Sequence, residues 1–228
     1  MISNPLEVFV DADVLAAPFT RTLLLMSAFE AGSGFRPRWS ALVEDQANSH
    51  VRGSQRRIGD IRRQFEWMDE VLVSDSDDSG DLPGDTDPGD RHVLRAARTA
   101  EIGVVVTRNV HHFGEADLQA PSMSAVNPDQ FLAWIVTRGQ YRSTLEYMAA
   151  ARSRPPNTVE GLHAAVAGGH PRLFEAMRTA FPGVEPVRSG DRPAKEVFRG
   201  SRCIVCGREL DADGVGRGGV GMDHLRVP

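Results

Sequence analysis

Two aspartates that directly follow a short apolar run constrain this chain more than any other feature. Residues 8–10 are Val-Phe-Val, and Asp11 and Asp13 come next. Such a run is typical of a buried strand, and open α/β sheets bind ligands beyond the carboxyl ends of their strands. Carboxylates at that edge suit a divalent cation and, through it, phosphate chemistry. Aspartate is also a common helix N-cap, so a capping role is the alternative.

The composition predicts one α/β domain with a small appendage. The chain has 228 residues, 41% of them hydrophobic, and apolar strands alternate with amphipathic helices. No apolar run reaches the roughly 20 residues that cross a bilayer, and no signal peptide is evident. The two cysteines are three residues apart, so a disulfide framework is not expected. We therefore expect a cytoplasmic protein with no membrane partner.

The apolar pattern predicts three units along the chain. The first, residues 1–139, carries the strands, the second, residues 140–182, is a helical extension, and the third, residues 183–228, is a flexible tail. The expected strands are 6–10, 71–73 and 104–107, and the expected helices are 18–31, one that Ser40 caps, 48–68, 90–99 and one that starts near Pro128.

Four polar segments can meet at the carboxyl edge of a parallel sheet. One follows the first strand, one lies in the first turns of the second helix, one opens a later helix, and one follows the strand at 104–107. Their polar residues are, in that order, Asp11 and Asp13, Glu44 and Gln46, Asp87 and Asp90, and Thr107, Asn109 and His112.

This ordered set resembles the PIN-domain nucleases, in particular the VapC-type toxins of bacterial toxin–antitoxin pairs. The matching segments are 9–15, 36–40, 87–94, 106–113 and 128–132, and the resemblance covers roughly residues 7–180. Residues 154–158 resemble a helical C-terminal extension found in one branch of these toxins. The resemblance implies a PIN-like parallel sheet flanked by helices.

The resemblance also implies a metal-dependent endoribonuclease. Mg²⁺ or Mn²⁺ would activate a water that hydrolyses RNA phosphodiesters. Its implied partners are an RNA substrate, a cognate antitoxin protein and a second copy of the chain in a homodimer.

The residues carried over from the family fall into three groups. The expected metal ligands are Asp11 and Asp90, the further catalytic acids are Asp13 and Glu44, and the polar pair that supports the site is Thr107 and Asn109.

At two positions the sequence departs from the family pattern. Gln46 occupies the position of the usual second acid, and His112 occupies that of the usual last acid, so both are expected as supporting residues. Glu44 is two residues before Gln46, about 200° round a helix, and is not an automatic replacement. These departures favour a second hypothesis, in which a PIN-like domain binds RNA or an antitoxin without cleavage.

Arginine supplies nearly all the positive charge of a chain whose formal net charge is −5, since Lys195 is the only lysine. Arg52, Arg56 and Arg57 lie on the helical region expected over 48–68, and we expect them to contact RNA phosphates. Docking of an acidic antitoxin segment and an ordinary solvated helix face are the alternatives.

Two other patterns were weighed. Asp11, Asp13 and Thr107 also fit a phosphatase of the haloacid dehalogenase type, which then needs a lysine, but the only lysine is Lys195, and Asp90 precedes Thr107. That function is therefore disfavoured. Cys203 and Cys206 look like half a zinc knuckle, but a structural zinc normally needs four ligands, so a reduced, unpaired pair is the alternative.

Overall fold

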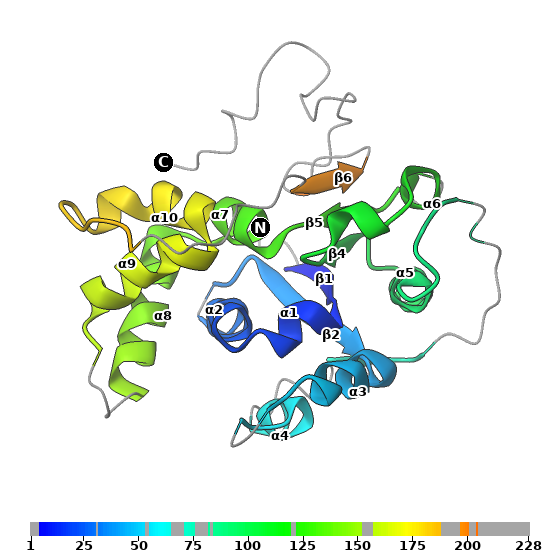
Figure 1. The fold of residues 1–228 in the computed structure, drawn as a ribbon, viewed down its shortest axis with the longest axis horizontal. Helices are drawn as coiled ribbons and strands as arrows, with labels where there is room; N and C mark the ends of the chain where they lie inside the picture. The colour runs from blue at the N-terminus through cyan, green and yellow to red at the C-terminus, as the bar shows by residue number, and fades with distance from the viewer. Residues whose placement is uncertain are drawn as a thin grey trace, which may run out of the picture.

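A mostly parallel sheet forms the centre of the computed structural model (Figure 1). The structure describes residues 5–30, 32–52, 55–64, 71–75, 82, 84–119, 122–151, 157–187, 197–200 and 204. Within these residues the sheet has six strands in the order β3-β2-β1-β4-β5-β6, and only β6 runs antiparallel to its neighbour. The strands are β1 (Leu6–Val10), β2 (Phe35–Ser40), β3 (Leu72–Val73), β4 (Val104–Val106), β5 (Ser124–Val126) and β6 (Phe198–Gly200).

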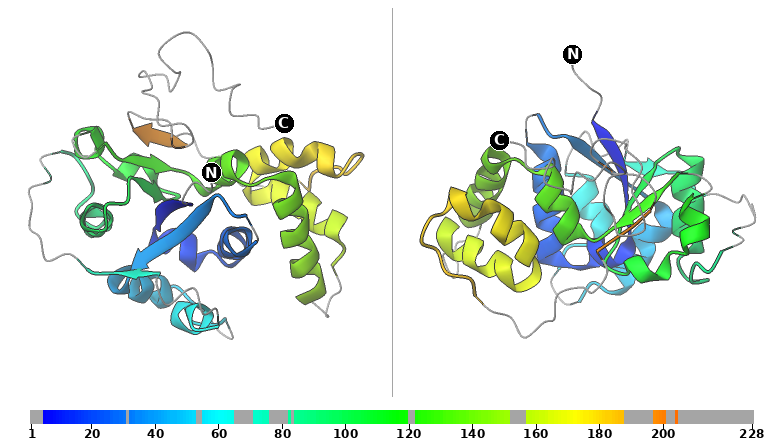
Figure 2. Two further views of the ribbon diagram at one scale, coloured as in Figure 1. Left: turned by 180° about the vertical axis from the view of Figure 1, so that it is seen from behind. Right: turned by 90° about the horizontal axis from the view of Figure 1, so that it is seen from above.

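Helices pack against the sheet and against one another (Figures 1 and 2). The α-helices are α1 (Ala12–Ala16), α2 (Pro18–Phe29), α3 (Ala41–Ser49), α4 (Ile58–Arg62), α5 (Arg91–Thr99), α6 (Glu115–Gln119), α7 (Pro128–Ile135), α8 (Arg138–Ala151), α9 (Val159–Gly169) and α10 (Pro171–Met177), and the 3-10 helices are η2 (Val110–His112) and η3 (Arg178–Ala180). The α5 helix packs on β2 and β4, and α2 packs on β2 and α7. The predicted fold class, an α/β sheet flanked by helices and consistent with a PIN-like fold, is confirmed.

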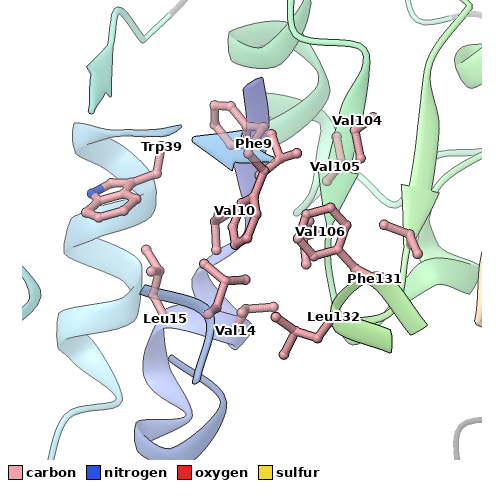
Figure 3. Close-up of a cluster of buried hydrophobic side chains, with 14 of the residues drawn as sticks. Phe9, Val10, Val14, Leu15, Trp39, Val104, Val105, Val106, Phe131 and Leu132 are labelled. Atoms are coloured by element: carbon pink, nitrogen blue, oxygen red, sulfur yellow. The ribbon is translucent and has the colours of Figure 1, made fainter. Parts of the chain in front are cut away.

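The core lies where β1 and β4 run side by side (Figure 3). Phe9 pairs with Val105 and Val10 pairs with Val106, and all four side chains are fully buried. A strand that is buried on both faces is a continuous apolar run in the sequence, which is why both strands could be predicted from it. Burying each such side chain contributes about 1.5–3 kcal/mol, so the core fixes β1 and β4 side by side.

The helical extension lies at one side of the α/β body, beside α2 and α7 (Figures 1 and 2). The α10 helix packs on α7 and α9, and α8 packs on α9 and α2. The Asp129 carboxylate in α7 accepts hydrogen bonds from the backbone N–H groups of Arg172 and Leu173 at 3.1 and 2.9 Å. Asp129 therefore ties the first turn of α10 to the α/β body.

Some local predictions are confirmed and others are wrong. Strand β1 spans residues 6–10 as expected, and Ser40 Oγ accepts a hydrogen bond from Val43 N at the start of α3. The single helix expected over 48–68 is wrong, because α3 ends at Ser49 and α4 spans Ile58–Arg62. The Asn48 side chain accepts from Ile58 N at 2.8 Å and so satisfies a backbone N–H in the first turn of α4.

Three strands, β2, β5 and β6, were not expected. The β2 strand contains Pro37 between two arginines, a composition that argues against a strand, yet β1 and β3 pair with it on both sides. The sheet thus overrides the local sequence at this strand.

The segment expected as a tail contains β6, which pairs with β5. Most of residues 188–228, including Cys203 and Cys206 and the zinc prediction made for them, lie outside the described residues. No helix in the described ranges is both long and apolar enough to cross a membrane.

Candidate active site

Asp11 sits at the carboxyl end of β1 and also starts α1. Its Oδ1 atom accepts a hydrogen bond from Ala12 N at 2.6 Å, so the capping interpretation of this residue holds. Its Oδ2 atom accepts from the Thr107 hydroxyl at 2.8 Å. Only 5% of Asp11 is exposed, and the carboxylate is fixed from two sides.

Thr107 reaches Asp11 because β4 is the parallel neighbour of β1. Val106 pairs with Val10, so the residue after each strand lies at the same sheet edge. Thr107 Oγ1 also accepts a hydrogen bond from Asn109 N at 3.1 Å. Asn109 thus acts through its backbone on Thr107, and the expected polar pair lies in one network with Asp11.

Asp13 lies two residues after Asp11, in the first turn of α1. Its carboxylate accepts from the backbone N–H of Arg108 at 3.0 and 3.3 Å. The loop that follows β4 therefore holds both acids, Asp11 through Thr107 and Asp13 through Arg108.

Asp90 precedes α5 and faces η2. Its Oδ2 atom lies 2.8 Å from Nδ1 of His112. The side chain of Asp90 makes no capping bond with its own helix, so the imidazole is the partner that orients it.

Burial and mutual repulsion act on these acids together. Burial raises the pKa of the Asp11 carboxyl, and the nearby charge of Asp90 raises the same pKa further. Burial also raises the pKa of Asp13, with an additional contribution from the charge of Asp11. The carboxylates of Asp11, Asp13 and Asp90 therefore repel one another electrostatically, and a bound cation would relieve this repulsion.

The ligand set fits a hard cation that retains water. Carboxylate and hydroxyl oxygens are the ligands that Mg²⁺ takes, usually one or two carboxylates with several waters. Among the described residues, no three His, Cys, Asp or Glu side chains form a ready group for a metal. Asp11 and Asp90 supply carboxylate oxygens of this kind.

The two expected site residues of α3, Glu44 and Gln46, contact different partners. Glu44 Oε2 accepts from the Trp39 indole N–H at 3.1 Å and from Arg62 Nε at 3.0 Å. Gln46 Oε1 lies 3.0 Å from His92 Nε2, and the charge of Asp90 acts on His92. Gln46 thus contacts His92 of α5, whereas Glu44 ties α3 to α4.

The expected RNA-binding arginines lie around the start of α4. Arg52, Arg56 and Arg57 are all exposed, and among the described residues none of them forms an ion pair. Arg62 and Arg63, by contrast, pair with Glu44 and Asp60.

A groove of about 1010 Å³ adjoins the acidic edge. It begins at Asp13, Arg108 and Asn109 and continues past Thr20 to His170 at the start of α10. Sequence reasoning did not single out Thr20 or His170. The only local signal is the proline at the first position of α2 and of α10, which marks a helix start but not a site.

Fold and site together define an α/β protein with an acidic centre at the carboxyl edge of a parallel sheet. Over 103 residues the chain is 31% identical to a protein of Mycobacterium tuberculosis (strain ATCC 25618 / H37Rv) named "Putative ribonuclease VapC50". The aligned part is 44% of this chain and 61% of that protein, so the chain spans about three fifths of the curated relative that it matches. This similarity points to the VapC group of PIN-domain proteins. No family model and no solved structure matches the chain.

Proposed function

We propose that the chain is a divalent-metal-dependent endoribonuclease of the VapC type, the toxin of a toxin–antitoxin pair. The observation that carries the proposal is the buried carboxylate of Asp11, which Thr107 fixes beside the charge of Asp90. The similarity to the mycobacterial relative supports RNA as the substrate. A cognate antitoxin protein, a homodimer and a cytoplasmic location belong to the same proposal.

Asp11 and Asp90 would hold the metal ion, with Asp13 next to them. When bound, Mg²⁺ or Mn²⁺ supplies positive charge that polarises the phosphodiester and stabilises the charge of the transition state. Thr107 orients Asp11 by its hydrogen bond, His112 orients Asp90, and the backbone of Arg108 holds Asp13. These contacts hold the acids in place before the RNA arrives.

Other residues would act around this centre. Arg52, Arg56 and Arg57 would contact RNA phosphates, because all three are exposed cations. A catalytic role for Glu44 stays a prediction. Its Oε2 atom is bonded to Trp39 and Arg62, which supports a structural role for this residue as well.

A PIN-like domain that binds RNA or an antitoxin without cleavage is the second candidate. The pairs of Gln46 with His92 and of Asp90 with His112 favour it, because an amide and an imidazole stand where the family usually has acids. Fewer carboxylates attract a divalent cation less strongly. The haloacid-dehalogenase-type phosphatase remains the disfavoured alternative.

Calorimetry with Mn²⁺ and Mg²⁺ and an RNA-cleavage assay on the same samples test the proposal. We expect the wild-type protein to bind the ion and cut RNA, and the Asp11→Asn and Asp90→Asn variants to lose both. Asp45→Asn is the matched control, since Asp45 is an exposed acid on α3.

Each contrary outcome has a distinct meaning. Undiminished cleavage by Asp11→Asn would overturn the assigned site. Absence of both ion binding and cleavage in the wild-type protein would favour the domain that does not cut.

A further inference from the structure

The loop that follows β4 places Arg108 beside both acids that follow β1. The backbone N–H of Arg108 donates to the Asp13 carboxylate at 3.0 and 3.3 Å, and the hydroxyl of the preceding Thr107 donates to Asp11 at 2.8 Å. Asn109 N in turn donates to Thr107 Oγ1 at 3.1 Å. The backbone of Arg108 is therefore fixed at the acidic centre by bonds that do not use its side chain.

The guanidinium of Arg108 is left for another partner. The residue is exposed and lines the groove beside Asp13, and within the described ranges it forms no ion pair. Burial has the largest effect on the pKa of Asp13 and of His170, and the positive charge of Arg108 acts on both, in each case lowering the pKa. A charge that acts on both residues lies between the acidic centre and the start of α10.

The groove otherwise carries negative charge. Of the described residues that line it, Asp13, Asp129 and Glu175 are acids, and Arg108 is the only arginine or lysine. These carboxylates repel a phosphate that approaches Asp13 unless a cation offsets their charge. On the groove side the guanidinium of Arg108 can do so, and its planar set of N–H donors matches the oxygens of a phosphate.

We propose that Arg108 is a catalytic residue whose guanidinium donates hydrogen bonds to a non-bridging oxygen of the scissile phosphate. The inference rests on the proposed function and deepens it, because it names a side chain that contacts the reacting group. In the hydrolysis a water oxygen bonds to phosphorus, one P–O ester bond breaks, and a proton of the water ends on the leaving oxygen. Arg108 exchanges no proton in this step; it stabilises the negative charge that the non-bridging oxygens carry.

Two substitutions at Arg108 and one control test the inference. Arg108→Gln removes the charge, whereas Arg108→Lys keeps the charge and loses the planar set of donors. Both keep the backbone N–H that holds Asp13. Arg36→Gln is the matched control, since Arg36 is an exposed arginine near the amino end of β2, in register with Glu7, and so lies at the sheet edge opposite Asp11.

Three measurements are made on each full-length variant. Initial rates of RNA cleavage over a range of RNA concentrations at saturating Mg²⁺ give kcat and KM. Calorimetry with Mn²⁺ in the absence of RNA gives the affinity for the ion, and thermal unfolding shows whether the variant is folded.

We expect Arg108→Gln to lower kcat about 100-fold or more, with a smaller change in KM. Its affinity for Mn²⁺ should be at least as high as that of the wild-type protein, because a cation that repels the ion has been removed. Arg108→Lys should recover part of kcat, and Arg36→Gln should match the wild-type protein. Loss of cleavage with undiminished ion binding indicates contact with the phosphate, because displaced acids would lower both.

Four results would overturn the inference. They are cleavage by Arg108→Gln at the wild-type rate, equal kcat values for Arg108→Gln and Arg108→Lys, a rise in KM at unchanged kcat, and a parallel fall in kcat and ion affinity. The third would assign Arg108 to plain RNA binding, and the fourth would assign it to holding the acids. In each case cleavage by the wild-type protein leaves the proposed function standing, whereas a wild-type protein that binds no ion and cuts no RNA fails the function itself.

Discussion

Nδ1 of His112 lies 2.8 Å from Oδ2 of Asp90, which joins η2 to the start of α5 across the acidic edge. By the resemblance to PIN-domain nucleases, this imidazole stands at a position where those proteins usually carry an acid. It orients Asp90 without adding negative charge, and the balance between these two effects can be measured.

The first prediction concerns this pair. His112→Asp places a second carboxylate beside Asp90, and two like charges about 4 Å apart repel by roughly 4 kcal/mol at an effective dielectric constant near 20. A divalent ion relieves that repulsion, so its affinity should rise roughly tenfold or more, whereas the metal-free variant should be less stable. Calorimetry with Mn²⁺ measures the change, and an affinity equal to that of the wild-type protein would place the ion away from Asp90.

The second prediction concerns the hydroxyl that fixes Asp11. Thr107→Val keeps the shape of the side chain but removes the hydrogen bond to Oδ2. Loss of a residue that orients a metal ligand typically costs 10–100-fold in affinity or activity. We expect cleavage to fall within that range, measured as an initial rate at fixed Mg²⁺. Thr22→Val is the control, since its hydroxyl donates to Pro18 O on the same helix, and an equal fall in both variants would contradict the assignment.

The third prediction is a pH dependence. Burial raises the pKa of Asp11 from 3.8 to about 6, so the folded protein binds a proton that the unfolded chain releases. The contribution of Asp11 to the free energy of unfolding is therefore fully present below pH 4 and is lost as the pH rises through 6. The loss is on the order of 3 kcal/mol.

Thermal unfolding without metal at pH 4 to 8 checks this sign. Asp11→Asn cannot ionise, so its melting temperature should exceed that of the wild-type protein increasingly as the pH rises. Added Mg²⁺ should stabilise the wild-type protein at pH 7.5 and leave the variant unchanged. A difference that is constant over this range would contradict the raised pKa.

The fourth prediction separates two roles of Glu44. Its ion pair with Arg62 is largely shielded, with side-chain exposures of 14% and 16%. Glu44→Gln and Arg62→Met should each lower the unfolding free energy by about 1–3 kcal/mol. Arg63→Met is the control, because the pair of Arg63 with Asp60 is exposed and such pairs contribute little.

Activity measured on the same samples completes this test. If Glu44 is structural, Glu44→Gln and Arg62→Met should affect cleavage only in proportion to their loss of folded protein. Loss of cleavage in Glu44→Gln at unchanged stability, with a normal Arg62→Met variant, would instead support Glu44 as a catalytic acid.

The fifth prediction concerns how the helical extension is held. Asp129 is 4% exposed and accepts from the N–H groups of Arg172 and Leu173. Asp129→Ala leaves both donors without this acceptor and should cost about 1–3 kcal/mol, or roughly 2–4 °C per kcal/mol in melting temperature. Glu175→Gln removes one partner of the exposed ion pair between Glu175 of α10 and Arg178, and should change little. Equal melting temperatures for the two variants would contradict the role given to Asp129.

Long apolar runs and helix starts were readable in the sequence because they are local. Residues 8–10 and 104–106 are continuous apolar segments, and the caps at Asp11 and Ser40 need only a few neighbouring residues. The β2 strand was missed for the opposite reason, because Pro37 and its flanking arginines form a strand only between two partners.

The partners of each site residue depended on the tertiary structure. Glu44 and Gln46 are two residues apart on one helix, and only the packing of α4 and α5 decides that one meets Arg62 and the other His92. The contact between Thr20 and His170 joins residues 150 positions apart, and no local pattern encodes it.

The sequence by itself determined the α/β class, the apolar runs of β1 and β4 and the polar residues that follow them, because hydrophobic pattern is a local property of the chain. The tertiary structure alone decided which charges act on Asp11 and which partners Glu44 and Gln46 of α3 contact. It also decided the groove between α2 and α10. Burial, distance and electrostatic coupling exist only once segments far apart in the chain have packed together.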